Sequence, residues 1–178
     1  MPDRILSAGS FLPLGGRRGS TLVVARSGMG KTHQVLTQVM DSLSQQEPVV
    51  ILDCGRTYRH FCEVIGGTYI RLQDGGRYES EHFGSAHLLV YEFEELTGVW
   101  DKTLPAIQDW VDVLSNGLVV VDEVWRVAKQ YPALTGELFA RVGQGAHYCI
   151  VGQSEEDVVP YRHIDANVRL VTMTELHN

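Results

Sequence analysis

The amino-acid sequence predicts an α/β fold in which a mostly parallel central sheet is flanked by helices. Two observations support this prediction. Short apolar runs rich in β-branched residues recur along the chain, as is typical of strands buried on both faces of a sheet. Most of these runs are followed by segments with apolar residues at three- and four-residue spacing, which indicates helices between the strands. Such an alternation of strands and helices favours a parallel sheet.

The first two strand–helix units are the clearest part of this pattern. A strand is expected at residues 21–25 (TLVVA), and a glycine-containing loop leads from it into a helix that follows Lys31 and ends before Pro48. The second unit joins a strand at residues 49–52 (VVIL) to a short helix at residues 58–65. A pair of glycines ends this second helix, as is common at helix C-termini.

The rest of the chain continues the alternation. Residues 1–20 are turn-rich and are expected to form an irregular N-terminal arm, and residues 21–178 are expected to form a single domain. The polar stretch at residues 73–87 is expected to be a mobile loop. Further strands are expected at residues 68–72, 88–93, 118–121, 148–151 and 168–171, and further helices at residues 104–114 and 138–142.

Composition limits the possible partners and compartments. The chain has 15 Lys and Arg against 22 Asp and Glu, which gives a net charge of −7. Because the chain as a whole is negative, any contact with DNA must be confined to local patches of positive charge. Its three cysteines have no CxxC spacing, which favours free thiols in a reducing compartment and a cytoplasmic protein. No apolar run approaches the roughly 18 residues of a spanning helix, so no transmembrane segment is expected.

A Walker A sequence stands between the first expected strand and helix. Residues 25–32 (ARSGMGKT) have the form AxxxxGKT, in the strand–loop–helix context that the motif requires. A chance glycine-rich turn is disfavoured because the Lys-Thr pair follows at the correct step. Lys31 is expected to reach phosphate oxygens and Thr32 to ligate Mg²⁺, so ATP and Mg²⁺ are the expected cofactors. The residues expected to bind the nucleotide are Ser27, Gly28, Met29, Gly30, Lys31 and Thr32.

Two acids follow the apolar strand at residues 118–121. Ligands of parallel sheets bind at the carboxyl ends of strands, where Asp122 is expected to hold Mg²⁺ through water. Glu123 is expected to orient and deprotonate the attacking water. Taken alone, two acids after a core strand are equally well explained as solvated charges, and the upstream loop tips the balance toward a catalytic site.

With these motifs in place, the chain resembles the HerA/FtsK superfamily of RecA-like motor ATPases. The resemblance covers residues 21–154 and rests on VVILDCGRTYRHFCEVIGGTYIRL, on VVVDEVWRV with Trp after the acids, and on GAHYCIVGQS. It implies that Gln153 is a polar sensor near the γ-phosphate, on a strand inserted between the two Walker strands. It also implies that Arg141 acts across a subunit interface of a homo-oligomeric ring, although an Arg at a helix C-terminus is equally well explained as a surface charge.

Two subgroups of this superfamily are similar to the chain. Conjugative VirB- and TraC-type ATPases carry a large N-terminal domain and a helical insertion, whereas here 20 residues precede the first core strand and the segment between the Walker motifs is short. In its short length, the chain is more similar to the compact genome-packaging ATPases of membrane-containing viruses. Both imply a motor that translocates double-stranded DNA, with a portal, secretion or membrane-associated complex as partner. The alternatives are an assembly ATPase that acts through protein contacts and, less favoured because of Glu123, a P-loop kinase.

Overall fold

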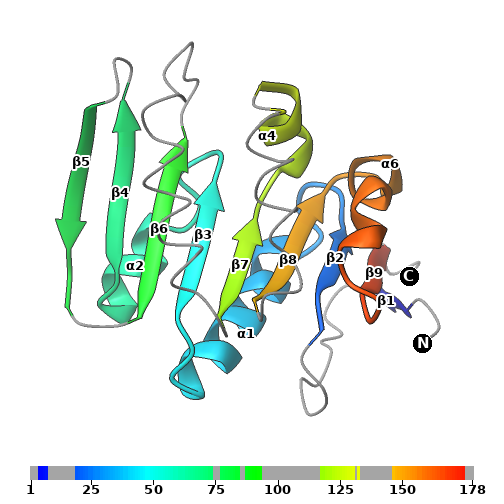
Figure 1. Ribbon diagram of the computed structural model, residues 1–178, viewed down its shortest axis with the longest axis horizontal. Helices are drawn as coiled ribbons and strands as arrows, with labels where there is room; N and C mark the ends of the chain where they lie inside the picture. The colour runs from blue at the N-terminus through cyan, green and yellow to red at the C-terminus, as the bar shows by residue number, and fades with distance from the viewer. Residues whose placement is uncertain are drawn as a thin grey trace.

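The structure of the chain is a computed structural model that describes residues 4–7, 19–73, 77–84, 87–93, 117–130, 132 and 146–174. Over these residues, nine strands form one sheet in the order β1-β9-β2-β8-β7-β3-β6-β4-β5 (Figure 1). Every pairing is parallel except that of β4 with β5, which confirms the predicted sheet. The strands are β1 (Arg4–Ser7), β2 (Thr21–Val24), β3 (Val49–Asp53), β4 (Thr68–Gln73), β5 (Arg77–His82), β6 (Leu88–Phe93), β7 (Leu118–Val121), β8 (His147–Gly152) and β9 (Arg169–Thr174).

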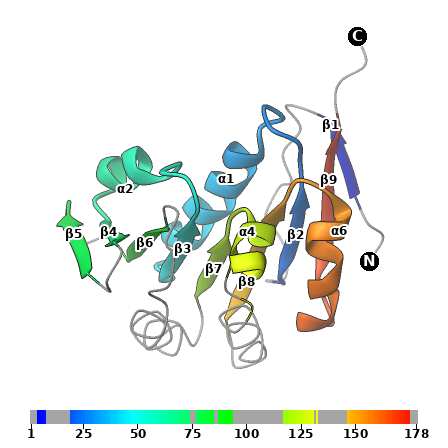
Figure 2. The ribbon, with the colours of Figure 1, turned by 90° about the horizontal axis from the view of Figure 1, so that it is seen from above.

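Helices lie on both sides of this sheet. The helices α1 (Lys31–Ser44) and α2 (Arg59–Ile65) lie above the sheet in Figure 2, and α6 (Glu155–Val158) lies on the opposite side. The remaining described helices are α4 (Val124–Gln130) and the 3₁₀ helix η1 (Val159–Ile164). None of the described helices is long and apolar enough to cross a membrane.

The core consists of one apolar cluster on each face of the sheet. Successive residues of a strand point to opposite faces, and on β2 Val23 joins the cluster beneath α1 while Leu22 joins the other one. All residues of β2, β3 and β7 are buried, which explains why these strands have continuous apolar sequences. The sequence therefore predicted the central strands close to their observed bounds.

The two edges of the sheet differ from the sequence-based expectation. Residues Arg77–His82, expected to be part of a mobile loop, form β5 and pair antiparallel with β4, so that prediction is wrong for this segment. Residues Arg4–Ser7 form β1 beside β9, although residues 1–20 were expected to be irregular. An edge strand has one neighbour and need not be apolar, so the polar sequence of β5 carries no strand pattern. The helices expected at residues 104–114 and 138–142 lie outside the described residues.

Candidate functional site

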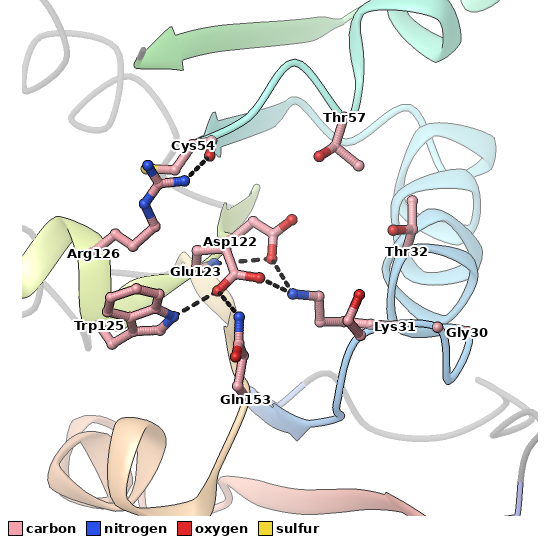
Figure 3. Close-up of a pocket in the computed structure, with 12 residues that line it drawn as sticks. Gly30, Lys31, Thr32, Cys54, Thr57, Asp122, Glu123, Trp125, Arg126 and Gln153 are labelled. Atoms are coloured by element: carbon pink, nitrogen blue, oxygen red, sulfur yellow. Dashed lines mark hydrogen bonds and ion pairs between the residues drawn. The ribbon is translucent and has the colours of Figure 1, made fainter. Parts of the chain in front are cut away.

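The order of the strands brings three separate segments together at the carboxyl ends of the parallel strands. β8 lies between β2 and β7 and is parallel to both, so Leu22 and Val121 both pair with Ile150. The carboxyl ends of the three strands are therefore aligned, and residues from the segments that follow them meet there (Figure 3). Open parallel sheets bind their ligands at the carboxyl ends of their strands. The strand that ends just before Gln153, β8, lies between β2 and β7, the strands that precede the two Walker motifs, as the resemblance implied.

The loop after β2 leaves the start of α1 open to an anion. Gly28 and Gly30 both have φ 83, a left-handed conformation that glycine adopts without steric cost. Gly30 is the N-cap of α1, and no side chain caps the helix. The first N–H groups of a helix have no partner within it and attract negative charge. Together with the ammonium of Lys31, they form a cradle whose charge and geometry suit a phosphate.

Asp122 is buried directly beneath this cradle. It is 3% exposed, and its Oδ2 accepts a hydrogen bond of 3.0 Å from the hydroxyl of Tyr58. Its Oδ1 accepts the N–H of Glu123 at 2.9 Å and lies 3.6 Å from Nζ of Lys31. Burial raises the pKa of Asp122, and the opposing effects of Lys31 and Tyr58 do not cancel this rise. A divalent cation at this carboxylate would favour its ionised form.

Glu123 is held by three donors. Its Oε1 is bound by the ammonium of Lys31, and its Oε2 accepts hydrogen bonds from Nε1 of Trp125 at 2.6 Å and from Nε2 of Gln153 at 3.1 Å. Burial raises the pKa of Glu123, but the hydrogen bonds from these donors outweigh it, so the pKa is lowered overall. The residue has φ 51, a conformation that costs an L-residue roughly 1–2 kcal/mol. This turn is where the chain leaves β7 and enters α4.

These groups line a single cavity of about 560 Å³, a volume within the range of small-molecule sites. Its far wall comes from the loop after β3 and from α4, where Nη1 of Arg126 donates to the carbonyl oxygen of Cys54 at 2.8 Å. Among the described residues no cluster of three His, Cys, Asp or Glu side chains forms a metal site. Thr32 and Asp122 line the same cavity, a donor set that suits Mg²⁺ completed by phosphate and water. The lining residues are Ser27, Gly28, Gly30, Lys31, Thr32, Cys54, Thr57, Asp122, Glu123, Trp125, Arg126 and Gln153.

Most residues that the sequence nominated are therefore brought together. Met29 is an exception, because its side chain packs against the apolar cluster beneath α1 instead of lining the cavity. Arg141 lies outside the described residues. Sequence reasoning did not assign the remaining wall. Trp125 and Arg126 follow the two acids closely in the sequence, so their place after the acids was a visible signal. Cys54 and Thr57 of the wall, and Tyr58 beneath Asp122, come to the site because β3 lies next to β7.

Comparison with known proteins bears on the fold. No protein-family model matches the sequence, and no curated protein matches it significantly. A solved structure that does match is the genome packaging NTPase B204 from Sulfolobus turreted icosahedral virus 2, in complex with AMP. The TM-score is 0.53 over 80% of this chain and 69% of that chain, with 16% sequence identity. The chain shares the fold of this NTPase. Its α/β architecture, with a mostly parallel sheet between helices, is thereby established.

Proposed function

We propose that the chain is a Mg²⁺-dependent ATPase and the subunit of a ring-shaped motor that translocates double-stranded DNA. The observation that carries this proposal is the meeting of Lys31, Asp122 and Glu123 in one cavity at the open end of α1. A phosphate-binding lysine, a buried carboxylate and a second, ionised carboxylate are the groups that nucleotide hydrolysis requires. A P-loop kinase needs no second carboxylate to activate water, so the presence of Glu123 favours hydrolysis.

The residues of the chain have separate tasks in this reaction. Lys31 and the N–H groups of the first turn of α1 bind and orient the phosphates. Thr32 and Asp122 would hold Mg²⁺, which when bound neutralises charge on the phosphate oxygens. Glu123 takes the proton of the attacking water on its carboxylate, which is ionised in the nucleotide-free site because its pKa is lowered there. Gln153 donates to the same carboxylate and lies where a polar sensor would meet the terminal phosphate.

The motor role rests on the fold and on the resemblance. The matching structure is that of a genome packaging NTPase, and the three motifs of the sequence resemble those of HerA/FtsK-type motors. Cys54, Cys62 and Cys149 are free and buried, as suits a protein of the reducing cytoplasm. We propose viral genome packaging as the process, with conjugative transfer as the second possibility. A portal, secretion or membrane-associated complex is the proposed docking partner.

The decisive experiment measures phosphate release by the purified chain with and without double-stranded DNA. Stimulation by DNA at low salt that fades as salt rises is expected, because phosphate contacts release counterions. Stimulation by a partner protein and not by DNA would indicate an assembly ATPase, and phosphate transfer to a small acceptor would indicate a kinase. Either result would overturn the motor proposal.

Two variants test the catalytic assignments in the same assay. Lys31→Ala should lose nucleotide affinity and turnover together, because the phosphate-binding cation is removed. Glu123→Gln should still bind ATP and Mg²⁺ but stall, because only the base is removed. Near-normal turnover by Glu123→Gln would contradict the assignment of Glu123.

We also propose that Arg141 completes the site of a neighbouring subunit. In a head-to-tail ring, an Arg from the next subunit can meet the charge that develops on the γ-phosphate. Arg141→Ala and Glu123→Ala should each be nearly inactive, yet subunit exchange between them should restore activity. An Arg141→Ala subunit keeps Glu123 and can receive Arg141 from its neighbour. No gain on mixing, with both variants assembled and binding ATP, would refute this role.

A further inference from the structure

The two oxygens of the Glu123 carboxylate have different kinds of partner. Oε1 is bound by the ammonium of Lys31, whereas Oε2 accepts two neutral N–H donors, from Trp125 at 2.6 Å and from Gln153 at 3.1 Å (Figure 3). Three different elements supply these donors, namely the start of α1, the start of α4 and the end of β8. The carboxylate side chain is 17% exposed and lies at the cavity wall.

One of these partners has to change when nucleotide binds. The proposed function places a phosphate at Lys31, whose ammonium is at present shared between Glu123 and Asp122, 3.6 Å away. A phosphate carries more charge than one carboxylate, and the uncapped N–H groups of α1 attract it to the same place. Lys31 therefore exchanges Oε1 of Glu123 for a phosphate oxygen. The amide nitrogen of Gln153 carries two N–H donors, so it can meet a phosphate and still donate to Oε2. Trp125 has no such competitor and keeps Oε2.

The backbone explains why Trp125 can hold a carboxylate two residues before it. Glu123 has φ 51, and its carbonyl oxygen accepts the N–H of Arg126 at 2.8 Å, which starts α4 directly at the acid. The indole of Trp125 in the first turn then lies against the carboxylate, although the residue is 37% exposed. An indole N–H donates one hydrogen bond and accepts none. Trp125 can therefore fix an anion but cannot compete with Glu123 for a proton.

We propose that Trp125, together with Gln153, anchors Oε2 of Glu123, so that the departure of Lys31 toward phosphate leaves Oε1 free and aimed at the attacking water. Trp125 is thus a positioning residue for hydrolysis, a role that rests on the proposed ATPase function. In the nucleotide-free site, the ion pair with Lys31 occupies Oε1. Glu123 becomes available as a base when Lys31 binds the phosphate instead of Oε1.

The test is Trp125→Phe, which keeps an aromatic ring and removes the N–H donor. The expected result is a fall in kcat of about 10- to 100-fold, as for other residues that orient a reacting group, with the Kd for a non-hydrolysable ATP analogue unchanged. A kcat within twofold of the parent would overturn the proposal. So would a parallel loss of nucleotide affinity and of the urea unfolding midpoint, because that would mark a packing role.

A spectroscopic measurement is independent of turnover. The indole ¹H–¹⁵N resonance of Trp125 is identified as the one that Trp125→Phe removes. A hydrogen bond to a carboxylate moves this resonance downfield, so Glu123→Gln should return it upfield, whereas the ATP analogue should leave it downfield. A resonance that ignores Glu123→Gln, or that moves upfield with the analogue, would contradict the anchoring.

The same set of variants separates this inference from the proposed function. If Glu123→Gln stalls and Lys31→Ala loses nucleotide while Trp125→Phe turns over normally, the anchoring fails and the ATPase assignment stands. If Glu123→Gln hydrolyses ATP normally, the ATPase assignment of Glu123 fails first.

Discussion

Replacing Tyr58 by Phe removes one oxygen atom from the floor of the site. Tyr58 is fully buried, and its hydroxyl donates to Oδ2 of Asp122 at 3.0 Å. Asp122 is itself 3% exposed, so water cannot readily replace the lost donor. A buried carboxylate without this donor keeps its desolvation cost and loses part of the compensation.

Hydrogen bonds to charged groups contribute about 1.5–3 kcal/mol to stability. Tyr58→Phe should therefore lower the free energy of unfolding by about that amount. For a domain of this size, the melting temperature should fall by roughly 3–12 °C. Urea and thermal unfolding followed by circular dichroism measure both quantities. A loss below about 0.5 kcal/mol, which is typical of a neutral substitution, would refute the reasoning.

The chain contains a matched control. Tyr69 is also buried, and its hydroxyl donates to Oε2 of the buried Glu92 at 2.7 Å; neither residue lines the cavity. Glu92 also accepts a hydrogen bond of 2.7 Å from Nε of Arg56, so Tyr69→Phe should destabilise the fold less. Tyr58→Phe should also alter the Mg²⁺ concentration required for ATP hydrolysis, because its partner is the proposed metal ligand. An equal change in Tyr69→Phe would contradict the assignment of Asp122.

Two further predictions concern stability. Gln46 has φ 60 at the end of α1, where the N–H of Glu47 donates to the carbonyl oxygen of Ser42 at 3.0 Å in a Schellman motif. Because glycine adopts this left-handed conformation without the steric cost of a side chain, Gln46→Gly should add about 1 kcal/mol to the free energy of unfolding. An unchanged or lower melting temperature would contradict this. Asp53 is fully buried, and burial raises its pKa from 3.8 to about 6, so its contribution to stability is complete below about pH 4 and is lost as the pH rises through about 6. The expected loss of stability is on the order of 3 kcal/mol. Asp53→Asn should flatten this decline when the free energy of unfolding is measured by urea titration between about pH 4 and pH 7. A decline that is unaltered in Asp53→Asn would disprove this role of Asp53.

The sequence predicted the parts of the fold whose burial leaves a pattern. β2, β3 and β7 are buried on both faces, and apart from Thr21 at the start of β2 and Asp53 at the end of β3 all their residues are apolar. β5 was missed because it lies at the edge of the sheet, where residues 79–82 are exposed and backbone pairing with β4 is sufficient. A polar segment can therefore be an edge strand and is not necessarily a loop.

The site was predictable where one short segment contains the chemistry. The cradle of Lys31 and Thr32 and the acids Asp122 and Glu123 are each contiguous in sequence. The hydroxyl of Tyr58 reaches Asp122 across 64 residues, and this contact exists because β3 is the neighbour of β7. Strand order is set by the packing of the whole sheet, so no local pattern of residues indicates that pairing.

Gln153 shows how distant segments fix one side chain. At the end of β8, a Cβ on Gly152 would lie 2.6 Å from Cβ of Asp157, so α6 can pack this closely only against glycine. Asp157 in turn accepts the N–H groups of Gln153 and Ser154 at 2.8 Å each, which fixes the turn after the strand. The backbone of Gln153 is thereby held by α6, while its side chain donates to Glu123 at the end of β7. A shift of α6 would therefore move the side chain of Gln153, the proposed sensor, relative to the carboxylate of Glu123, the proposed base.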